Sequence, residues 1–268
     1  MMRTIAVVLG ALALAGCAAR GRSAGGAPPA GPLADARQLV LVVTPGWDSV
    51  GATLRRYERD RAGSAWRVAA PPIPAVVGRT GLAWGDGLAP SAGERARLTG
   101  PVKREGDGRA PAGAFRLGAA FGFAPPDSVR PWLRMPYRQV TADFECVDDV
   151  ASRHYNRLVH RADAVPMDWS SSERMRTVQQ YRFGLVVDHN AGAGDGAPRP
   201  GGGSCIFLHI WARPSAPGAR PVGTAGCTAF APEELEALLR WLDPAARPML
   251  VQLPEAEYQR LRGAWGVP

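Results

Sequence analysis

Apolar runs rich in branched residues recur along the chain, and Pro or Gly bounds most of them. The run from Gln38 to Thr44 (QLVLVVT) stops at a Pro-Gly pair and predicts a buried strand. Later runs at 182–190 (RFGLVVDHN), 204–211 (SCIFLHIW) and 248–254 (PMLVQLP) predict three more strands. The hydrophobic pattern therefore favours a sheet as the main element of the core.

Helical spacing of apolar residues occurs in fewer places. The segment 48–60 (DSVGATLRRYERD) carries Val50, Leu54 and Tyr57 at helical intervals, which predicts a helix. The segment 91–98 (SAGERARL) contains a Ser-x-x-Glu capping box and predicts a short helix. The clearest predicted helix is 232–244 (PEELEALLRWLDP), because it begins with Pro, continues with two acidic residues and places its leucines on one face.

The segments that lack a clear period complete the fold prediction. Residues 64–85 and 104–125 are interrupted by Pro and Gly and predict short strands, hairpins and irregular strands. Residues 168–175 (DWSSSERM) suggest the start of a helix, and no internal repeat occurs. The predicted class is mainly β or α+β, a mixed β-sandwich with a few helices.

The N-terminus has the pattern of an export signal. An apolar run from Ile5 to Ala15 follows a single Arg and is about half of the roughly 20 residues that a membrane span needs. The residues Leu14-Ala15-Gly16-Cys17 resemble the lipobox of bacterial lipoproteins. We therefore expect a signal peptide over 1–16, lipidation of Cys17, and a protein anchored by its lipid in a bacterial membrane, facing the periplasm or cell wall. The alternative is a buried N-terminal helix with an ordinary cysteine.

Composition divides the rest of the chain. Residues 17–37 are mostly Ala, Gly, Pro, Ser and Arg, which predicts a flexible tether. We expect one domain over 38–256 and a C-terminal tail over 257–268. The net charge is +8 and Lys103 is the only lysine. The basic residues form no stripe interleaved with aromatic residues, which excludes a nucleic acid as the expected partner.

The number of cysteines points to one reactive thiol. If Cys17 carries a lipid, Cys146, Cys205 and Cys227 remain, an odd number in a compartment where thiols tend to pair. Cys146 and Cys205 are the candidates for a disulfide. Three buried free thiols are the alternative.

His209 and Cys227 are the candidate catalytic pair. His209 ends an apolar strand, and Cys227 follows the small residues VGTAG, which allow backbone N–H groups to approach a ligand. A thiol with an ordinary pKa of about 8.5 needs a neighbouring base or cation to act as a nucleophile. The N–H groups near Cys227 are suited to an oxyanion hole, where one donor contributes about 3 kcal/mol. This pattern favours acyl transfer.

The same residues resemble the L,D-transpeptidases of peptidoglycan, the YkuD-like domain. The motif of that family is a His followed, commonly eighteen residues later, by the Cys of Ser/Thr-His-Gly-Cys. His209 and Cys227 have this spacing, and Thr224 and Gly226 match the motif. Ala225 departs from it, since the family usually has a second histidine there.

A second resemblance lies upstream and a third departure lies downstream. Residues 108–115 (GRAPAGAF) resemble the family's T-P-x-G-x-F segment, with Ala110 in place of Thr, and Ala229 stands where the family often has Asn or Arg. Together the resemblances cover about residues 39–254 and imply the YkuD-like strand-rich fold.

The resemblance implies a mechanism without a cofactor or a metal. Cys227 would attack a peptidoglycan stem peptide and expel its terminal D-Ala, with His209 as general base and acid. The backbone near Ala225 and Gly226 would hold the oxyanion, and a carbonyl near Ile210 would orient the imidazole. An amine acceptor gives a 3,3 cross-link or exchanges the terminal D-amino acid, and water makes the enzyme an L,D-carboxypeptidase.

Other polar residues have weaker patterns. His189 and Asn190 end a strand and are candidates for the pocket, although a His at a strand end is more often a surface or satisfied core residue. The segments that contain His154, His160 and Trp169 read either as a lid or as insertion loops with ordinary packing.

Three other function classes were compared with these residues. A serine D,D-transpeptidase needs Ser-x-x-Lys, and Gly100 stands three positions before the only lysine, which excludes that class. A zinc peptidase needs a motif such as H-E-x-x-H, and neither that motif nor H-x-H occurs. A non-catalytic envelope-binding protein with the same fold remains as an alternative, and Ala225 is its best support.

Overall fold

A computed structural model describes residues 31–192, 196–212 and 221–268. The predicted signal peptide, Cys17 and the predicted tether before residue 31 lie outside the described residues. No helix within the described part is long and apolar enough to cross a membrane.

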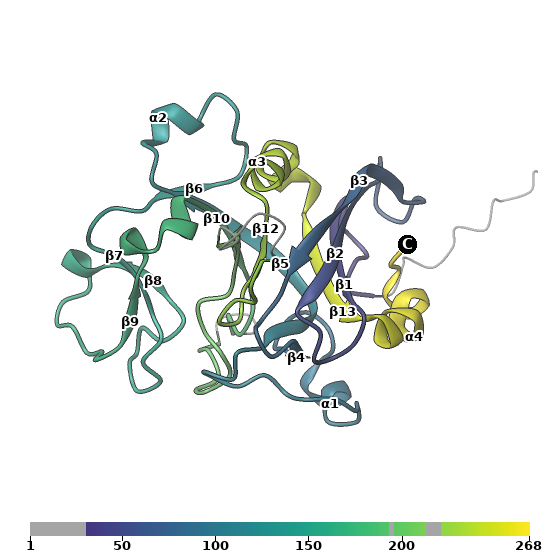
Figure 1. Cartoon of the computed structure of the whole chain (residues 1–268), viewed down its shortest axis with the longest axis horizontal. Helices are drawn as coiled ribbons and strands as arrows, with labels where there is room; N and C mark the ends of the chain where they lie inside the picture. The colour runs from purple at the N-terminus through teal and green to yellow at the C-terminus, as the bar shows by residue number, and fades with distance from the viewer. Residues whose placement is uncertain (1–30, 193–195, 213–220) are drawn as a thin grey trace, which may run out of the picture.

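The main sheet is mixed and closes on itself. Its path runs β10-β11-β12-β3-β2-β1-β13-β5-β4, β10 also pairs with β5, and β6 adds to the edge of β5 (Figure 1). The strands span β1 Gln38–Thr44, β2 Gly51–Glu58, β3 Arg67–Val76, β4 Leu82–Trp84, β5 Ala110–Gly122, β6 Tyr137–Gln139, β10 Phe183–Val187, β11 Phe207–Ile210, β12 Thr228–Phe230 and β13 Met249–Pro254. The predicted strand-rich class is confirmed, but the main sheet closes like a barrel and does not form the expected sandwich, because β10 pairs with both β11 and β5.

A smaller sheet lies to one side of the main sheet (Figure 1). It has the order β8-β7-β9, with β7 at Phe144–Val147, β8 at Leu158–His160 and β9 at Ser172–Arg174. The 3-10 helix η1 Arg161–Asp163 follows β8, and the 3-10 helices η2 Met175–Thr177 and η3 Gln179–Arg182 connect β9 to β10.

Four α-helices and one more 3-10 helix surround the sheets in the described residues. They are α1 Ala92–Arg95, α2 Pro126–Val129, α3 Pro232–Trp241, α4 Glu255–Trp265 and η4 Pro244–Ala246. The capping box predicted for α1 is present, because Ser91 Oγ accepts the Glu94 N–H at 3.3 Å and Glu94 Oε2 accepts the Ser91 N–H at 2.8 Å. The apolar face of α3 buries Leu235, Leu238 and Leu239, as its spacing predicts.

The segment expected to be a helix at 48–60 is a strand instead. Residues 51–58 form β2, which pairs with β1 on one side and β3 on the other. Within β2 the alternate residues Leu54 and Arg56 are buried, which is the period of a strand. The two neighbouring strands bond its backbone on both sides, and that long-range pairing outweighs the local helical spacing.

The segment 168–175 also differs from its prediction. It forms β9 rather than the start of a helix, because Ser172, Glu173 and Arg174 pair with β7. Serine side chains favour turns and strand ends over helix interiors, since they bond to nearby backbone or carboxylate groups. Here Ser172 Oγ donates to the buried Glu145 at 2.7 Å.

The folded unit extends beyond 38–256 at both ends. Leu33 and Ala36, which were assigned to the tether, are buried in the core. The expected tail forms most of α4, which lies beside β13 and β1 and buries Trp265. These ends are ordered because their few large apolar side chains find a place against the sheet.

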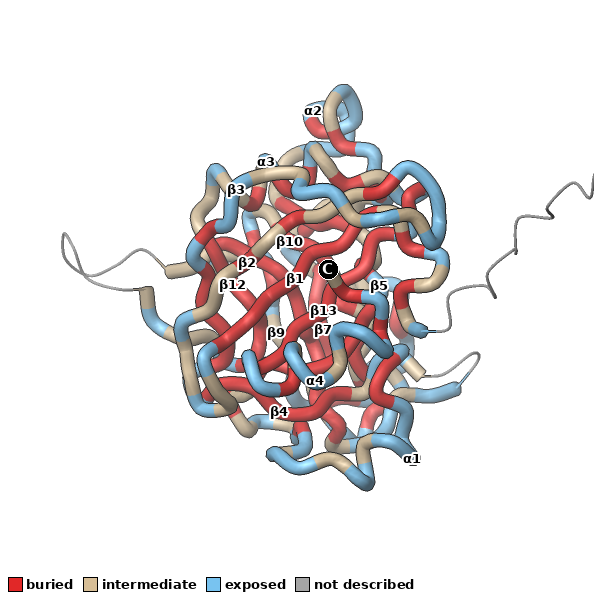
Figure 2. The backbone as a smooth tube through the Cα atoms, turned by 90° about the vertical axis from the view of Figure 1, so that its right-hand side faces the viewer, coloured by how far each residue is buried: buried red, intermediate tan, exposed pale blue. Residues whose placement is uncertain are grey.

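The core surrounds the strands that position the later site. All seven residues of β1 are buried, as the continuous apolar run predicts. Figure 2 shows the buried backbone concentrated where the strands cross the middle of the molecule. Gly113 in β5 has φ +146°, and a Cβ there would lie 2.6 Å from the Ala89 carbonyl oxygen, so this position requires glycine.

Candidate active site

β11 and β12 bring the predicted pair to one cavity. They are parallel neighbours whose register places Leu208 opposite Thr228 and His209 opposite Ala229. Cys227 comes directly before β12, and its Sγ accepts the Phe207 N–H at 3.3 Å. Cys227 and His209 both line a cavity of about 460 Å³. One strand pairing thus brings together two residues that are eighteen positions apart in the sequence.

Cys227 is the free cysteine of the described residues and is 6% exposed. Its thiol donates to the Cys205 carbonyl at 3.4 Å. Burial, and after it the nearby Glu173 carboxylate, raise the pKa of the Cys227 thiol to about 12, although the Phe207 N–H, Lys103 and the Tyr181 hydroxyl oppose the shift. The resting side chain is thus a neutral thiol that requires a base.

His209 has the protonation state that a base needs. Burial lowers its pKa to about 4, so the imidazole is neutral near pH 7. Nδ1 donates to the Ile210 carbonyl at 2.8 Å, which is the kind of contact that the family resemblance implies. Because a carbonyl can only accept, the proton is on Nδ1 and Nε2 is left as an acceptor.

Thr224 organises the turn that precedes the cysteine. Its Oγ1 accepts the Gly226 N–H at 3.1 Å and donates to the Cys227 carbonyl at 2.7 Å. The Gly226 amide is therefore already engaged. Within the described residues no hydrogen bond engages the N–H groups of Ala225 and Cys227, so two amides of the predicted oxyanion hole are unengaged. Ala225 lines the cavity and adds no polar side chain.

The other two cysteines of the domain are joined. Cys146 in β7 and Cys205 before β11 form a disulfide across 59 residues. Asn156 adds hydrogen bonds beside this disulfide. Its side chain accepts the Cys205 N–H at 2.9 Å and donates to the carbonyls of His189 and Asn190. The small sheet is thus tied to the backbone that contacts the Cys227 thiol.

His189 and Asn190 are not lining residues of this cavity, so the expected pocket role does not hold. His189 is buried, accepts the Asp86 N–H at Nδ1 (3.2 Å) and donates from Nε2 to the Gly202 carbonyl at 3.0 Å. Asn190 bonds to Arg199 and to the Gly203 carbonyl. Both side chains are satisfied within the protein and hold the loop that leads to Cys205.

The region read as a lid contributes a wall of the cavity through other residues. His154 packs edge-on against Trp169, with ring centroids 5.4 Å apart, and neither lines the cavity. Asp148 and Glu173 from the same region do line it. His160 lies outside it and bonds to Thr141 and Asp143.

Six ionisable residues of the cavity wall were not predicted. They are Arg79, Lys103, Glu105, Asp148, Glu173 and Tyr181. Tyr181 lies with its ring edge-on to His209, 5.3 Å between centroids, and donates to Glu173 Oε2 at 2.7 Å. Only Lys103 carries a signal in the sequence, since it is the single lysine.

The described residues contain no group of three or more His, Cys, Asp and Glu side chains placed to hold a metal ion. Comparison of the chain with protein-family models, with curated proteins and with solved structures finds no match. The geometry of the cavity and the resemblance of its motif are therefore what point to a function.

Proposed function

We propose that this protein is a cysteine acyltransferase of the L,D-transpeptidase type that acts on peptidoglycan stem peptides. One observation carries the proposal: a free Cys227 and a neutral His209 share a cavity, and the imidazole is held with its acceptor nitrogen free. The His-to-Cys spacing and the segment 108–115 support it by resemblance. The YkuD-like fold belongs to the same proposal.

The chemistry that follows is acyl transfer in two steps. His209 Nε2 takes the Cys227 proton while Sγ bonds to the carbonyl carbon of the third stem residue. The tetrahedral oxyanion accepts the Cys227 N–H, the C–N bond to the terminal D-Ala breaks, and the imidazolium protonates the leaving amine. An incoming amine loses its proton to His209, attacks the thioester and restores the thiol. If water is the acceptor, the product is a shortened stem peptide.

The proposed location follows from the N-terminal pattern. A lipid on Cys17 would anchor the protein in a membrane of the bacterial envelope, and the tether would let the domain reach the peptidoglycan. No cofactor enters the reaction, and the partners are the stem peptides and the membrane. Bound lipid on Cys17 is detectable as added mass on the mature N-terminal peptide.

The first prediction tests the nucleophile. Incubation of the full chain with a carbapenem should add the mass of one drug molecule, and Cys227→Ala should add none. Tetrapeptide muropeptides should release D-Ala with the wild type only. Because a thiol with a pKa near 12 depends on its base, His209→Ala should slow acylation about 10²-fold or more. Intact mass spectrometry against time measures all three.

The outcomes separate the alternatives. If the wild type forms no adduct and releases no D-Ala, the enzyme proposal fails and a non-catalytic envelope-binding protein remains. Equal labelling of Cys227→Ala would show that Cys227 is not the nucleophile. Thermal unfolding of each variant is the control for loss of the fold.

A further inference from the structure

The only lysine of the chain lies beside the proposed nucleophile. Lys103, in the connection between β4 and β5, is 2% exposed and lines the same cavity as Cys227 and His209. Lysine is almost never fully buried without a partner, because removing an ammonium from water is costly. The other 31 basic residues are arginines. Its burial at this wall therefore requires a local reason.

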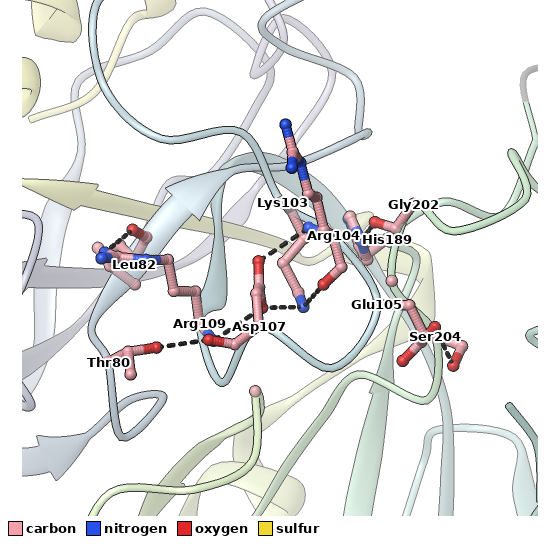
Figure 3. Close-up of polar contacts among 12 residues, drawn as sticks. Thr80, Leu82, Lys103, Arg104, Glu105, Asp107, Arg109, His189, Gly202 and Ser204 are labelled. Atoms are coloured by element: carbon pink, nitrogen blue, oxygen red, sulfur yellow. Dashed lines mark hydrogen bonds and ion pairs between the residues drawn. The ribbon is translucent and has the colours of Figure 1, made fainter.

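The first part of that reason is a carboxylate that holds the ammonium. Lys103 Nζ donates to Asp107 Oδ1 at 2.6 Å and to the Arg104 carbonyl at 2.7 Å (Figure 3). Asp107 is fixed in turn by the backbone N–H groups of Arg104 and Arg109. An ammonium has three N–H donors, and the third has no partner among the described residues.

The second part is that the Lys103 ammonium lies close to the turn at residues 224–227, which ends at Cys227. A Cβ built on Gly226 would lie 3.8 Å from Lys103 Nζ, so the ammonium lies beside the residue that precedes Cys227. In this turn the Gly226 N–H is engaged by Thr224, and Ala225 offers no polar side chain. The turn itself can offer an anion only the backbone N–H groups of Ala225 and Cys227, and the Lys103 cation lies next to it.

We propose that the positive charge of Lys103 stabilises the negative charge that develops on Cys227 Sγ and on the oxyanion during acylation. Lys103 is in this sense a positioning residue. This inference rests on the acyl transfer proposed above. In a buried site a cation that lines the same cavity as a developing negative charge acts on it with little screening by solvent. Lys103 would supply a positive charge beside a turn in which Ala225 has no polar side chain.

The charge balance around the thiol is otherwise unfavourable to an anion. Three acidic side chains from three segments line the cavity, and they are Glu105, Asp148 and Glu173. Besides Lys103 and Cys227, the remaining ionisable groups of the lining are Arg79, Tyr181 and His209. The Glu173 carboxylate raises the pKa of the Cys227 thiol, whereas the Lys103 charge lowers it. Lys103 thus opposes the acidic wall.

The test compares two alkylating reagents on one thiol. The full chain carrying Cys17→Ser keeps Cys227 as its reactive thiol, and is treated at pH 8 with iodoacetate, an anion, or with iodoacetamide, which is neutral. The ratio of the two rates reports the local charge, because the thiolate is the same for both reagents. Lys103→Met should lower this ratio about tenfold.

Two variants supply the controls. Asp107→Asn removes the charge that neutralises Lys103, so the ratio should rise. Arg104→Met removes an equal charge from an exposed neighbouring side chain, and the ratio should stay within about twofold because solvent screens it. If Lys103→Met does not fold, Lys103→Gln keeps a donor for Asp107 without the charge.

The proposal is overturned if Lys103→Met and Arg104→Met give the same ratio, or if Cys227 in the wild type reacts with neither reagent. A purely structural role would change both rates together and leave the ratio unchanged. Alkylation needs no peptidoglycan and no carbapenem. A shifted ratio in a protein that forms no carbapenem adduct would therefore refute the transpeptidase while leaving the charge assignment intact.

Discussion

At the scale of single side chains, Tyr181 connects two residues of the cavity wall, His209 and Glu173. Its ring packs against His209, its hydroxyl donates to Glu173, and both Tyr181 and Glu173 are largely buried. Burial raises the pKa of the Glu173 carboxyl and of the Tyr181 phenol. Each polar atom here is stable only because a neighbouring residue satisfies it.

Tyr181→Phe should therefore lower the free energy of unfolding by about 1–3 kcal/mol, since Glu173 loses its buried donor. Glu173→Gln should lower the free energy of unfolding less in the Tyr181→Phe variant than in the wild type. The difference is a coupling energy of about 0.5–3 kcal/mol. Urea unfolding of the two single variants and the double variant measures this cycle. Additive effects would contradict the direct coupling of the two side chains.

At the scale of elements, the disulfide connects the small sheet to the site. Cys146 comes from β7, and Cys205 lies just before β11, where its carbonyl contacts the Cys227 thiol. Closing 59 residues of chain restricts the unfolded state strongly. The disulfide thus contributes stability and also fixes one neighbour of the nucleophile.

Replacing Cys146 and Cys205 together with Ala should lower the free energy of unfolding by about 2–5 kcal/mol. Acylation of Cys227 should slow as well, because the Cys205 backbone loses its covalent restraint. Denaturant unfolding and the rate of carbapenem adduct formation measure the two effects. Dithiothreitol should destabilise the wild type and leave the double variant unchanged; sensitivity of the double variant would contradict the assignment.

Elements also show how far local pattern predicts this fold. The strands β1, β10, β11 and β13 and the helices α1 and α3 follow from apolar runs and caps, because their own residues decide them. β2 and β9 do not follow, since pairing with distant strands decides their conformation. The sequence did not predict α4, because its apolar residues are few and are buried only by packing against the sheet.

At the scale of the whole molecule, two buried histidines make stability depend on pH. Burial lowers the pKa of His189 and of His209 to about 4, below the ordinary value of 6.5. Between these values the unfolded chain binds protons that the folded chain does not, so stability falls as the pH falls. Glu173 and Asp188, whose pKa is raised by burial, act in the opposite direction.

We expect each histidine to contribute a loss of about 3 kcal/mol in the free energy of unfolding between pH 7 and pH 4. His189→Gln should reduce the loss by one such contribution, and the carboxyl contributions cancel in the comparison with the wild type. Urea unfolding at intervals of half a pH unit measures it. Parallel curves for the two proteins would contradict the burial of a neutral His189.

The sequence by itself determined the strand-rich class, the apolar core strands and the spacing of His209 and Cys227, because each depends on residues close together in the chain. The tertiary structure alone decided which groups meet in the cavity. It joined the candidate pair Cys146 and Cys205, directed His189 to the Gly202 carbonyl, and brought Lys103 beside the turn before Cys227. These contacts join distant segments, and neither the number of cysteines nor the single lysine fixes where the folded chain brings them together.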